Sequence, residues 1–480
     1  MNTWNSSLTT LVGGFVEPIF DGEQNLKKIY AVYCNSNNRV YGIPLFGRYI
    51  YKFNPDDKSC TTIDIQQIEH DLKLVEGVED GKGCIYCTAI WKERVRRVRT
   101  IYGLVKIDTT RDDAVTLLGP HHFHILCTTR GVLGLDGNIY YIPKRRSGKM
   151  LKLNTDSDTF EHVGQIVENG YSWACLGKDG CIYGIPHKIN TIVKYDPVTI
   201  VTSLVGEKYT FPFDCECNGA LAKNGCIYAF SSYNNWILKI DTNEHGENDT
   251  FVAWELITNF SIHEGSPYHS YGEAIMGLDG CIYWPPLDAN LTLKHDPLNG
   301  HTSCVGNNFG TLSLKYYGGA LAQDGVIYCI PWHAAMVLAI DPFRVFQETV
   351  AYYMERYPER FGCGLFDNNE KGITFFDSAI NTYGRRGFEA VIHLLPKPDV
   401  LELPNRELYP YVEAALCPNS ALSVVYYLLR QAPDMLRQAP DLIPTTIIAC
   451  GDTVEPLSDD DNPLSKKKKK IHCNVYTISI

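Results

Sequence analysis

The sequence has no long hydrophobic run, and this absence sets the first limit on what the protein can be. A membrane-spanning helix needs about 18 or more apolar residues in succession, so we expect no membrane span. The opening segment MNTWNSSLTT has neither the basic region nor the apolar core of a secretory signal. We therefore expect an intracellular, cytoplasmic protein.

Standard catalytic signatures are also missing. The chain contains no G-x-S-x-G nucleophile motif, no H-E-x-x-H zinc motif, no phosphate-binding glycine loop and no pair of C-x-x-C motifs. A binding protein without a cofactor is therefore favoured over an enzyme. An enzyme whose catalytic residues are dispersed along the chain remains the alternative.

An excess of positive charge is absent as well. The net charge is −11, with 21% charged and 45% hydrophobic residues. This balance argues against a nucleic-acid partner and is typical of an ordinary globular protein. At 480 residues the chain is long enough for one large domain and a smaller one.

What the chain does contain is an internal repeat. The segment KDGCIYGIPHKINTIVKYDP, at residues 178–197, returns in similar form from Lys223, Leu278 and Gln323. A tyrosine after an aliphatic residue marks seven copies, 43 to 55 residues apart, at Tyr41, Tyr86, Tyr140, Tyr183, Tyr228, Tyr283 and Tyr328. A repeat of this length built from short strands and turns predicts a seven-bladed β-propeller with four strands in each blade.

The last copy lacks a fourth strand. After Pro342 the chain continues as FRVFQETVAYYMERY, which predicts a helix, whereas LTTLVG at residues 8–13 matches the fourth strands of other copies. Because a closed ring leaves no unpaired radial edge, we predict that the N-terminal strand completes the last blade.

The predicted fold is therefore mainly β, with three parts. Residues 1–342 form the propeller, residues 343–450 a small α-helical domain, and residues 451–480 a disordered charged tail. Apolar residues at helical spacing, such as Phe346, Val350 and Tyr353, support the second part. The tail holds five lysines from Lys466 to Lys470, which could be a nuclear localisation signal or a solvated run.

Disulfide bonds are not expected, although the chain has 17 cysteines. Cys84, Cys181, Cys226 and Cys281 occupy one slot of successive copies and fall inside expected strands. Slots one blade apart are too distant to bridge, so these thiols are expected to pack as small buried hydrophobes. A reducing compartment fits this placement.

Two connections between second and third strands are strongly basic. The second blade carries WKERVRRVRTI and the third carries KRRSGK, and both loops leave the same rim of the ring. The residues concerned are Arg94, Arg96, Arg97, Arg145 and Arg146. They predict a dock for an acidic peptide or phosphate, because guanidinium groups suit such anions, or alternatively a solvated rim.

A second candidate surface lies at the start of the inner strands. Counting back from each Asp-Gly turn, one equivalent position holds Arg130, Trp173, Asn218, Glu273 and Gly318. If these residues point to the axis, they line the mouth of the central channel. Variation within a regular repeat is expected of a recognition surface and also of unconstrained positions.

Histidines and paired cysteines give only weak metal candidates. His122 and His124 would share one side of an extended segment on the rim of the third blade, with His187 and His333 in other rim loops. A metal held at the channel mouth could polarise a carbonyl or activate water, which is the basis of an alternative reading as a hydrolase or lyase. Surface histidines are the simpler interpretation. Cys215-Glu216-Cys217 is an incomplete zinc set.

With the repeat described, the copies at Asp179, Asn224, Asp279 and Asp324 resemble the D-G-x-I-Y-x-I-P…I-D-P repeats of uncharacterised diatom-type β-propeller proteins with a helical, ankyrin-like tail. The resemblance covers roughly residues 35 to 445 and implies this architecture without a particular chemistry. The blade pattern is also distantly similar to that of virginiamycin B lyase, but no catalytic motif matches. The paired glycines of kelch repeats are missing.

These observations predict a monomeric, non-catalytic propeller that binds a protein or peptide partner on its loop-bearing rim. Varied rim loops are present in the chain, and a catalytic constellation is not recognisable. The alternative is the metal-assisted hydrolase or lyase at the channel mouth.

Overall fold

The computed structural model describes residues 8–13, 29–44, 48–65, 68, 72–94, 98–118, 130–143, 147–168, 170–206, 213–214, 219–231, 236–244, 254–258, 271–344, 379, 382–383, 470–472 and 477–479. The chain divides into two compact units, Met1–Pro342 and Phe343–Ile480.

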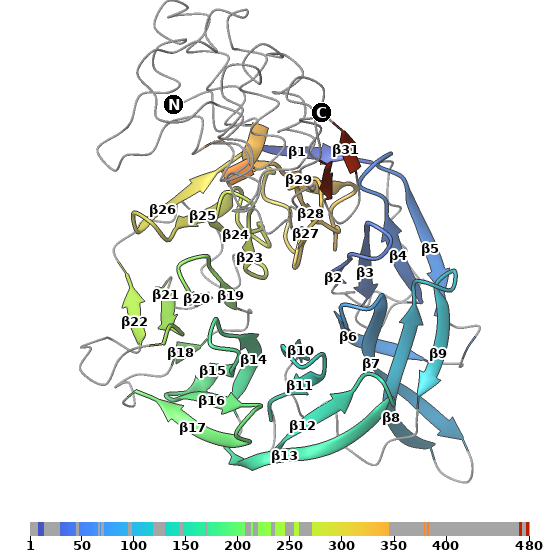
Figure 1. The fold of residues 1–480 in the computed structure, drawn as a ribbon. Coiled ribbons are helices and arrows are strands. Elements are labelled where there is room, and N and C mark those ends of the chain that lie inside the picture. The colour runs from blue at the N-terminus through green and yellow to red at the C-terminus, as the bar shows by residue number, and fades with distance from the viewer. Residues whose placement is uncertain are drawn as a thin grey trace, which may run out of the picture. The chain divides into compact units, whose positions relative to one another are not determined.

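The first unit is a seven-bladed β-propeller, with the sheets arranged around one axis (Figure 1). Each of the first three blades is a meander of four antiparallel strands. Blade 1 contains β2 (Ile29–Cys34), β3 (Arg39–Pro44), β4 (Tyr49–Phe53) and β5 (Cys60–Asp64). Blade 2 contains β6 (Lys73–Glu79), β7 (Cys84–Arg94), β8 (Val98–Asp108) and β9 (Ala114–Leu118). Blade 3 contains β10 (Val132–Leu133), β11 (Ile139–Tyr141), β12 (Gly148–Asn154) and β13 (Thr159–Val167).

The next three blades follow the same order. Blade 4 contains β14 (Tyr171–Leu176), β15 (Ile182–Ile189), β16 (Ile192–Asp196) and β17 (Val201–Val205), and β18 (Phe213–Asp214) pairs with β15. Blade 5 contains β19 (Gly219–Leu221), β20 (Cys226–Ser231), β21 (Trp236–Asp241) and β22 (Trp254–Ile257). Blade 6 contains β23 (Ile275–Met276), β24 (Ile282–Trp284), β25 (Thr292–Asp296) and β26 (His301–Val305).

The seventh sheet combines the two ends of the first unit. Its inner three strands are β27 (Ala320–Leu321), β28 (Ile327–Cys329) and β29 (Val337–Ile340), and its outer strand is β1 (Thr9–Val12). β1 runs antiparallel to β29, with Thr9 opposite Ile340 and Val12 opposite Val337. Leu8 O also accepts a bond from Asp341 N at 2.8 Å.

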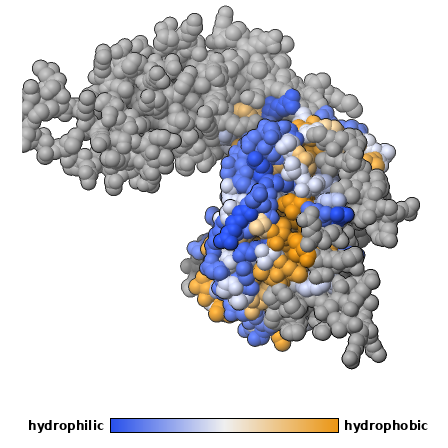
Figure 2. Space-filling view, turned by 90° about the vertical axis from the view of Figure 1, so that its right-hand side faces the viewer, coloured by the Kyte–Doolittle hydropathy of each residue, from blue (hydrophilic) through white to orange (hydrophobic). Residues whose placement is uncertain are grey.

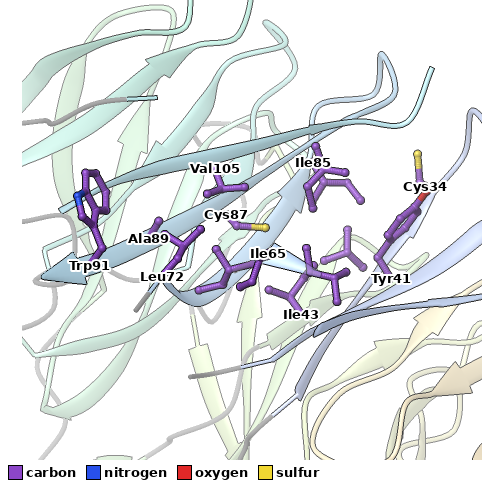
Figure 3. Packing of buried hydrophobic residues seen from close by; sticks show 14 residues of the cluster. Cys34, Tyr41, Ile43, Ile65, Leu72, Ile85, Cys87, Ala89, Trp91 and Val105 are labelled. Carbon is purple, nitrogen blue, oxygen red and sulfur yellow. The ribbon is translucent and has the colours of Figure 1, made fainter. Parts of the chain in front are cut away.

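Hydrophobic layers between neighbouring blades make up the core. Between blades 1 and 2, Ile43 and Leu72 pack against Ile85 and Cys87, and all four are buried (Figure 3). Burying an aliphatic side chain of this size contributes about 1.5–3 kcal/mol, so the repeated apolar strands are the main stabilising feature. Viewed onto the outer strands of the first blades, hydrophilic residues form a band beside a group of hydrophobic ones (Figure 2).

The repeated tyrosine is a buried hydrogen-bond donor. In blade 4, Tyr183 donates to Asp179 of its own Asp-Gly turn at 2.9 Å, and Lys194 pairs with the same carboxylate at 2.7 Å. In blade 2, Lys82 stands in place of that aspartate, and Tyr86 donates instead to Asp158 of blade 3 at 2.6 Å.

Blade 1 makes the same exchange. Asn37 stands at the aspartate position, and Tyr41 donates to Asp113 of blade 2, which also pairs with Lys52. In these three blades the tyrosine has a carboxylate acceptor, supplied by its own turn or by the next blade. In blade 5, Asn224 stands at the aspartate position, and its amide donates to the Tyr228 hydroxyl at 3.0 Å.

Little of the second unit lies within the described residues. Phe343 packs edge-on against Tyr383, with ring centroids 5.3 Å apart. β30 (Lys470–His472) pairs with β31 (Thr477–Ser479) inside the segment predicted to be a disordered tail, where the residues Ile471, Thr477 and Ile478 favour strands. The helical domain and the rest of the tail lie outside the described residues. None of the described helical residues forms a segment long and apolar enough to cross a membrane.

Candidate functional site

The equivalent position at the start of each inner strand, six residues before the aspartate of the turn, brings side chains from different blades to the propeller axis. Arg130 precedes β10, Trp173 lies in β14, and Glu273 precedes β23. Three of the five residues predicted for the channel mouth therefore meet in one cluster, which we call the axial cluster. Gly318 lies beside Glu273, and Asn218 is outside the described residues.

Arg130 is the central member of the axial cluster. Its Nη1 donates to Glu273 Oε2 at 3.1 Å, its Nε to Gly77 O at 2.9 Å, and its Nη2 to Ala31 O at 3.3 Å. The guanidinium carbon also lies 5.4 Å from the ring centroid of Trp173. One side chain of blade 3 thus contacts blades 1, 2, 4 and 6.

Aromatic rings surround the ion pair. Tyr30 of blade 1 lies edge-on to Tyr317 at 5.2 Å and 6.4 Å from Trp173. Burial raises the pKa of the Tyr30 hydroxyl well above its usual value, and the negative charges of Glu76 and Glu273 raise it further. Arg130 opposes this effect only in part, so the phenol stays protonated near neutral pH.

The close approach of Glu273 explains the glycine in blade 7. A Cβ atom on Gly318 would lie 2.8 Å from Glu273 Oε2 and 3.3 Å from the backbone nitrogen of Ala31. Any larger residue would displace the carboxylate from Arg130.

Three members of the cluster were not predicted from the sequence. Counting back six positions from Lys82 and from Asn37, which replace the aspartate of the Asp-Gly turn, gives Glu76 and Ala31. The alignment of inner strands did not reach Glu76 and Ala31, because the turns of blades 1 and 2 lack the aspartate from which the positions were counted. Tyr30 lies one position earlier, and nothing in the repeat singles it out.

The axial cluster is a packed core rather than an exposed surface. The side chain of Arg130 is 14% exposed and that of Glu273 is 2% exposed, and Trp173 and Tyr30 are buried. A buried charge is tolerated only when it is paired and hydrogen-bonded, as both are here. The predicted residues Trp173 and Glu273 therefore hold the blades together at this level of the axis.

The predicted basic loops lie largely outside the described residues. Arg94 ends β7, where it is paired with Val98 of β8, and Arg96 and Arg97 belong to the connection between these strands. Arg145 and Arg146 lie in the corresponding connection of blade 3. Nothing of their side-chain contacts is described.

A described rim segment between blades 6 and 7 is held by a buried lysine. Lys315 Nζ donates to the carbonyl oxygens of Asp288 at 3.3 Å, Gly310 at 3.4 Å and Leu312. Burial lowers the pKa of Lys315, and nearby Asp288 opposes that shift. These bonds fix the residues that lead into the inner strand of blade 7.

The metal candidates do not converge in the part of the chain that can be seen. Over the described ranges, no group of three or more His, Cys, Asp or Glu side chains could hold a metal ion. His122, His124, Cys215 and Cys217 lie outside those ranges. His187 is in β15 of blade 4, and His333 follows β28 of blade 7.

The described cysteines of the repeated slot are unreactive structural residues. Cys181, Cys226 and Cys281 are buried and free, and Cys84 is half-buried. Burial raises the thiol pKa of Cys84 and Cys226 to about 11 and that of Cys181 and Cys281 to about 12. Since the thiolate is the nucleophile and the metal ligand, these thiols are inert near neutral pH. The burial predicted from the sequence is confirmed for Cys181, Cys226 and Cys281, whereas Cys84 is only half-buried.

Comparison with known proteins supports the fold. A selenomethionine-substituted virginiamycin B lyase from Staphylococcus aureus is 12% identical, with a TM-score of 0.50 over 69% of this chain and 97% of that chain. A catalytically inactive variant of that lyase, crystallised with quinupristin, is 11% identical, with a TM-score of 0.50 over 69% of this chain and 98% of that chain. The sequence matches none of the protein-family models and none of the curated proteins. The structural similarity shows that the chain shares the β-propeller fold. Because the sequence identity is so low, no activity can be transferred from these proteins to this chain.

Proposed function

We propose that the protein is a non-catalytic binding module that recognises a protein or acidic peptide on the rim where Arg94 and the basic connections of blades 2 and 3 emerge. The observation that carries this proposal is the axial cluster. Side chains of Arg130, Trp173 and Glu273 occupy the axis, which leaves the rim connections as the variable surface of the propeller.

The chemistry of the rim supports an anionic partner. Arg94, Arg96, Arg97, Arg145 and Arg146 gather positive charge in two adjacent blades of a chain with a net charge of −11. Guanidinium groups bind carboxylates through paired hydrogen bonds, and a local field of opposite sign raises the association rate of an acidic segment. Binding should therefore weaken as salt is added.

The test uses a fluorescently labelled glutamate-rich peptide and the full chain, followed by anisotropy at low and physiological salt. Replacing the five arginines with alanine should abolish binding. A matched control, the double variant K82A/R111A, removes two exposed basic residues from the turns at the opposite rim and should bind normally. Equal binding by all three proteins, or no binding by the wild type, would refute the proposal.

A metal-assisted lyase or hydrolase is the second candidate, supported by the fold similarity to virginiamycin B lyase. The charge of Arg130 weighs against a cation at the level of the axial cluster, because two positive charges in a buried site repel strongly. Metal analysis of the purified chain separates the candidates. A stoichiometric divalent ion that is lost from an H122A/H124A variant would favour the enzyme.

Two further features belong to this proposal. The pairing of β1 with β29 supports an N-terminal strand that closes the ring. A cytoplasmic location accords with the free, protonated thiols of the described blades.

A further inference from the structure

The adjacent blades 3 and 4 carry a concentration of exposed hydrophobic residues, most of them in or next to the outer strands β13 and β17. Among the described residues, nine large hydrophobics are exposed, and six of them lie on these two adjacent blades: Leu135, Ile166, Val198, Ile200, Val201 and Leu204. β13 and β17 are neighbouring outer strands (Figure 1). The backbone nitrogen of Gln165 in β13 donates to Thr202 Oγ1 in β17 at 3.2 Å.

β17 is an edge strand without the usual protection. It is the last strand in its sheet, and within the described residues its only strand partner is β16. The segment from Val198 to Gly206 contains no charged residue and no proline. Native edge strands normally carry lysine, proline or bulges, because an unpaired backbone edge pairs readily with another chain.

Blade 6 shows that the blade fold does not need these apolar residues. Its corresponding segment builds the same turn, with Gly300 N bonded to Asp296 O at 2.8 Å where Ile200 N bonds to Asp196 O at 2.9 Å. The strand that follows keeps Thr302 and Ser303 in the places of Thr202 and Ser203. Three of the differences replace apolar residues of blade 4: Ile200, Val201 and Leu204 correspond to Gly300, His301 and Cys304, whereas Val198 corresponds to the exposed Leu298.

Ile200 has a backbone conformation that isoleucine disfavours. Its φ angle is +61°, and the corresponding Gly300 has a φ angle of +71°. A β-branched residue in this left-handed region is strained, whereas glycine adopts it freely. The side chain of Ile200 is nevertheless 59% exposed and gains little from burial. A strained and exposed isoleucine indicates a role outside the folding of the monomer.

We propose that β17 is a self-association edge, where two copies of the chain pair their β17 strands antiparallel about a twofold axis at Ser203. This pairing sets Val201 opposite Val205 and Thr202 opposite Leu204, a combination of aliphatic and β-branched residues that suits cross-strand contact. It is independent of the proposed partner rim and replaces the monomer expected from the sequence.

A second copy is favoured as the occupant because the antiparallel register of β17 with itself sets only uncharged residues opposite one another. Each chain carries a net charge of −11, so two copies repel unless they meet on a neutral surface. The uncharged segment around β17 supplies such a surface. The exposed side chains of Leu204 (57%), Ile166 (75%) and Val201 (49%) then become buried between the copies.

Sedimentation velocity of the full chain over a range of concentrations tests this inference. The wild type should form a dimer, and L204K should raise the dimer dissociation constant by at least about tenfold, because a charge enters the neutral contact. L312K changes an exposed leucine of the blade 6 to blade 7 connection and should dimerise normally. A monomeric wild type at every concentration, or a dimer that L204K leaves intact, would overturn the proposal.

Two further variants separate association from folding. I200G relieves the strained turn, so it should raise the thermal unfolding midpoint while weakening the dimer. S203C should form an intermolecular disulfide under mild oxidation, because the residue on the twofold axis faces its own copy, whereas S303C at the matching position of blade 6 should not. Weak crosslinking of S203C, equal to that of S303C, would place the contact elsewhere.

Discussion

Replacing Arg130 by methionine tests the axial cluster most directly. The substitution keeps much of the side-chain volume and removes three hydrogen bonds, one of them to the Glu273 carboxylate. It leaves that carboxylate, which is 2% exposed, without its guanidinium partner. Removing one member of a buried ion pair typically costs about 3–5 kcal/mol, so R130M should lower the free energy of unfolding by that amount.

The assay is denaturant unfolding followed by intrinsic fluorescence, with the slope compared between proteins. The double variant R130M/E273Q removes the stranded charge and should recover part of the loss, which gives a positive coupling energy in a double-mutant cycle. R111A, an exposed arginine on a turn, is the control and should change stability by no more than about 0.5 kcal/mol. A loss below about 1 kcal/mol for R130M would show that the cluster is not a stabilising contact between blades.

Three further predictions concern other parts of the propeller. D113N should destabilise the protein by about 1–3 kcal/mol, because Tyr41 and Lys52 lose the charged carboxylate that they share, and adding N37D should restore much of this stability by supplying a carboxylate from blade 1; urea unfolding of both variants checks this. Burial lowers the pKa of His295 to about 4, so the folded protein binds this proton less readily than the unfolded chain, and stability should fall as pH drops from about 6.5 toward 4. Thermal melts across that range should show a shallower decline for H295F. Deleting residues 1–13 removes β1 and should produce a concentration-dependent aggregate in light scattering, because β29 loses its partner; a monomeric, fully stable truncation would contradict this.

The regular part of the fold could be predicted because each blade has a similar local sequence pattern. The turn, the aliphatic-tyrosine pair and the run of buried residues recur in the same order every 43 to 55 residues, and the seven sheets follow them. The marker tyrosines show why the turn residue recurs: Tyr183 is buried and donates to Asp179, and the equivalent Tyr228 accepts from Asn224, because a buried hydroxyl needs a polar partner.

The site was harder to predict because its contacts join residues far apart in sequence. The alignment of inner strands identified Arg130, Trp173 and Glu273 as equivalent positions, but their burial depends on the diameter of the ring and on side-chain length. The guanidinium reaches across the axis to blade 6, which no local spacing encodes. The exchange of Asp179 for Asp113 or Asp158 as tyrosine acceptor was hidden for the same reason, since it passes between blades.

The position of β1 also has a consequence for how the protein is made. Its residues are synthesised before the first six blades, yet their partner strand, Val337–Ile340, is synthesised only after those blades. Joining chain segments separated by so many residues carries an entropic cost of about 5 kcal/mol, and contacts of such long range slow folding. β1 therefore lacks its partner strand while the first six blades are being synthesised, a period in which a chaperone that holds β-strands would have its greatest effect.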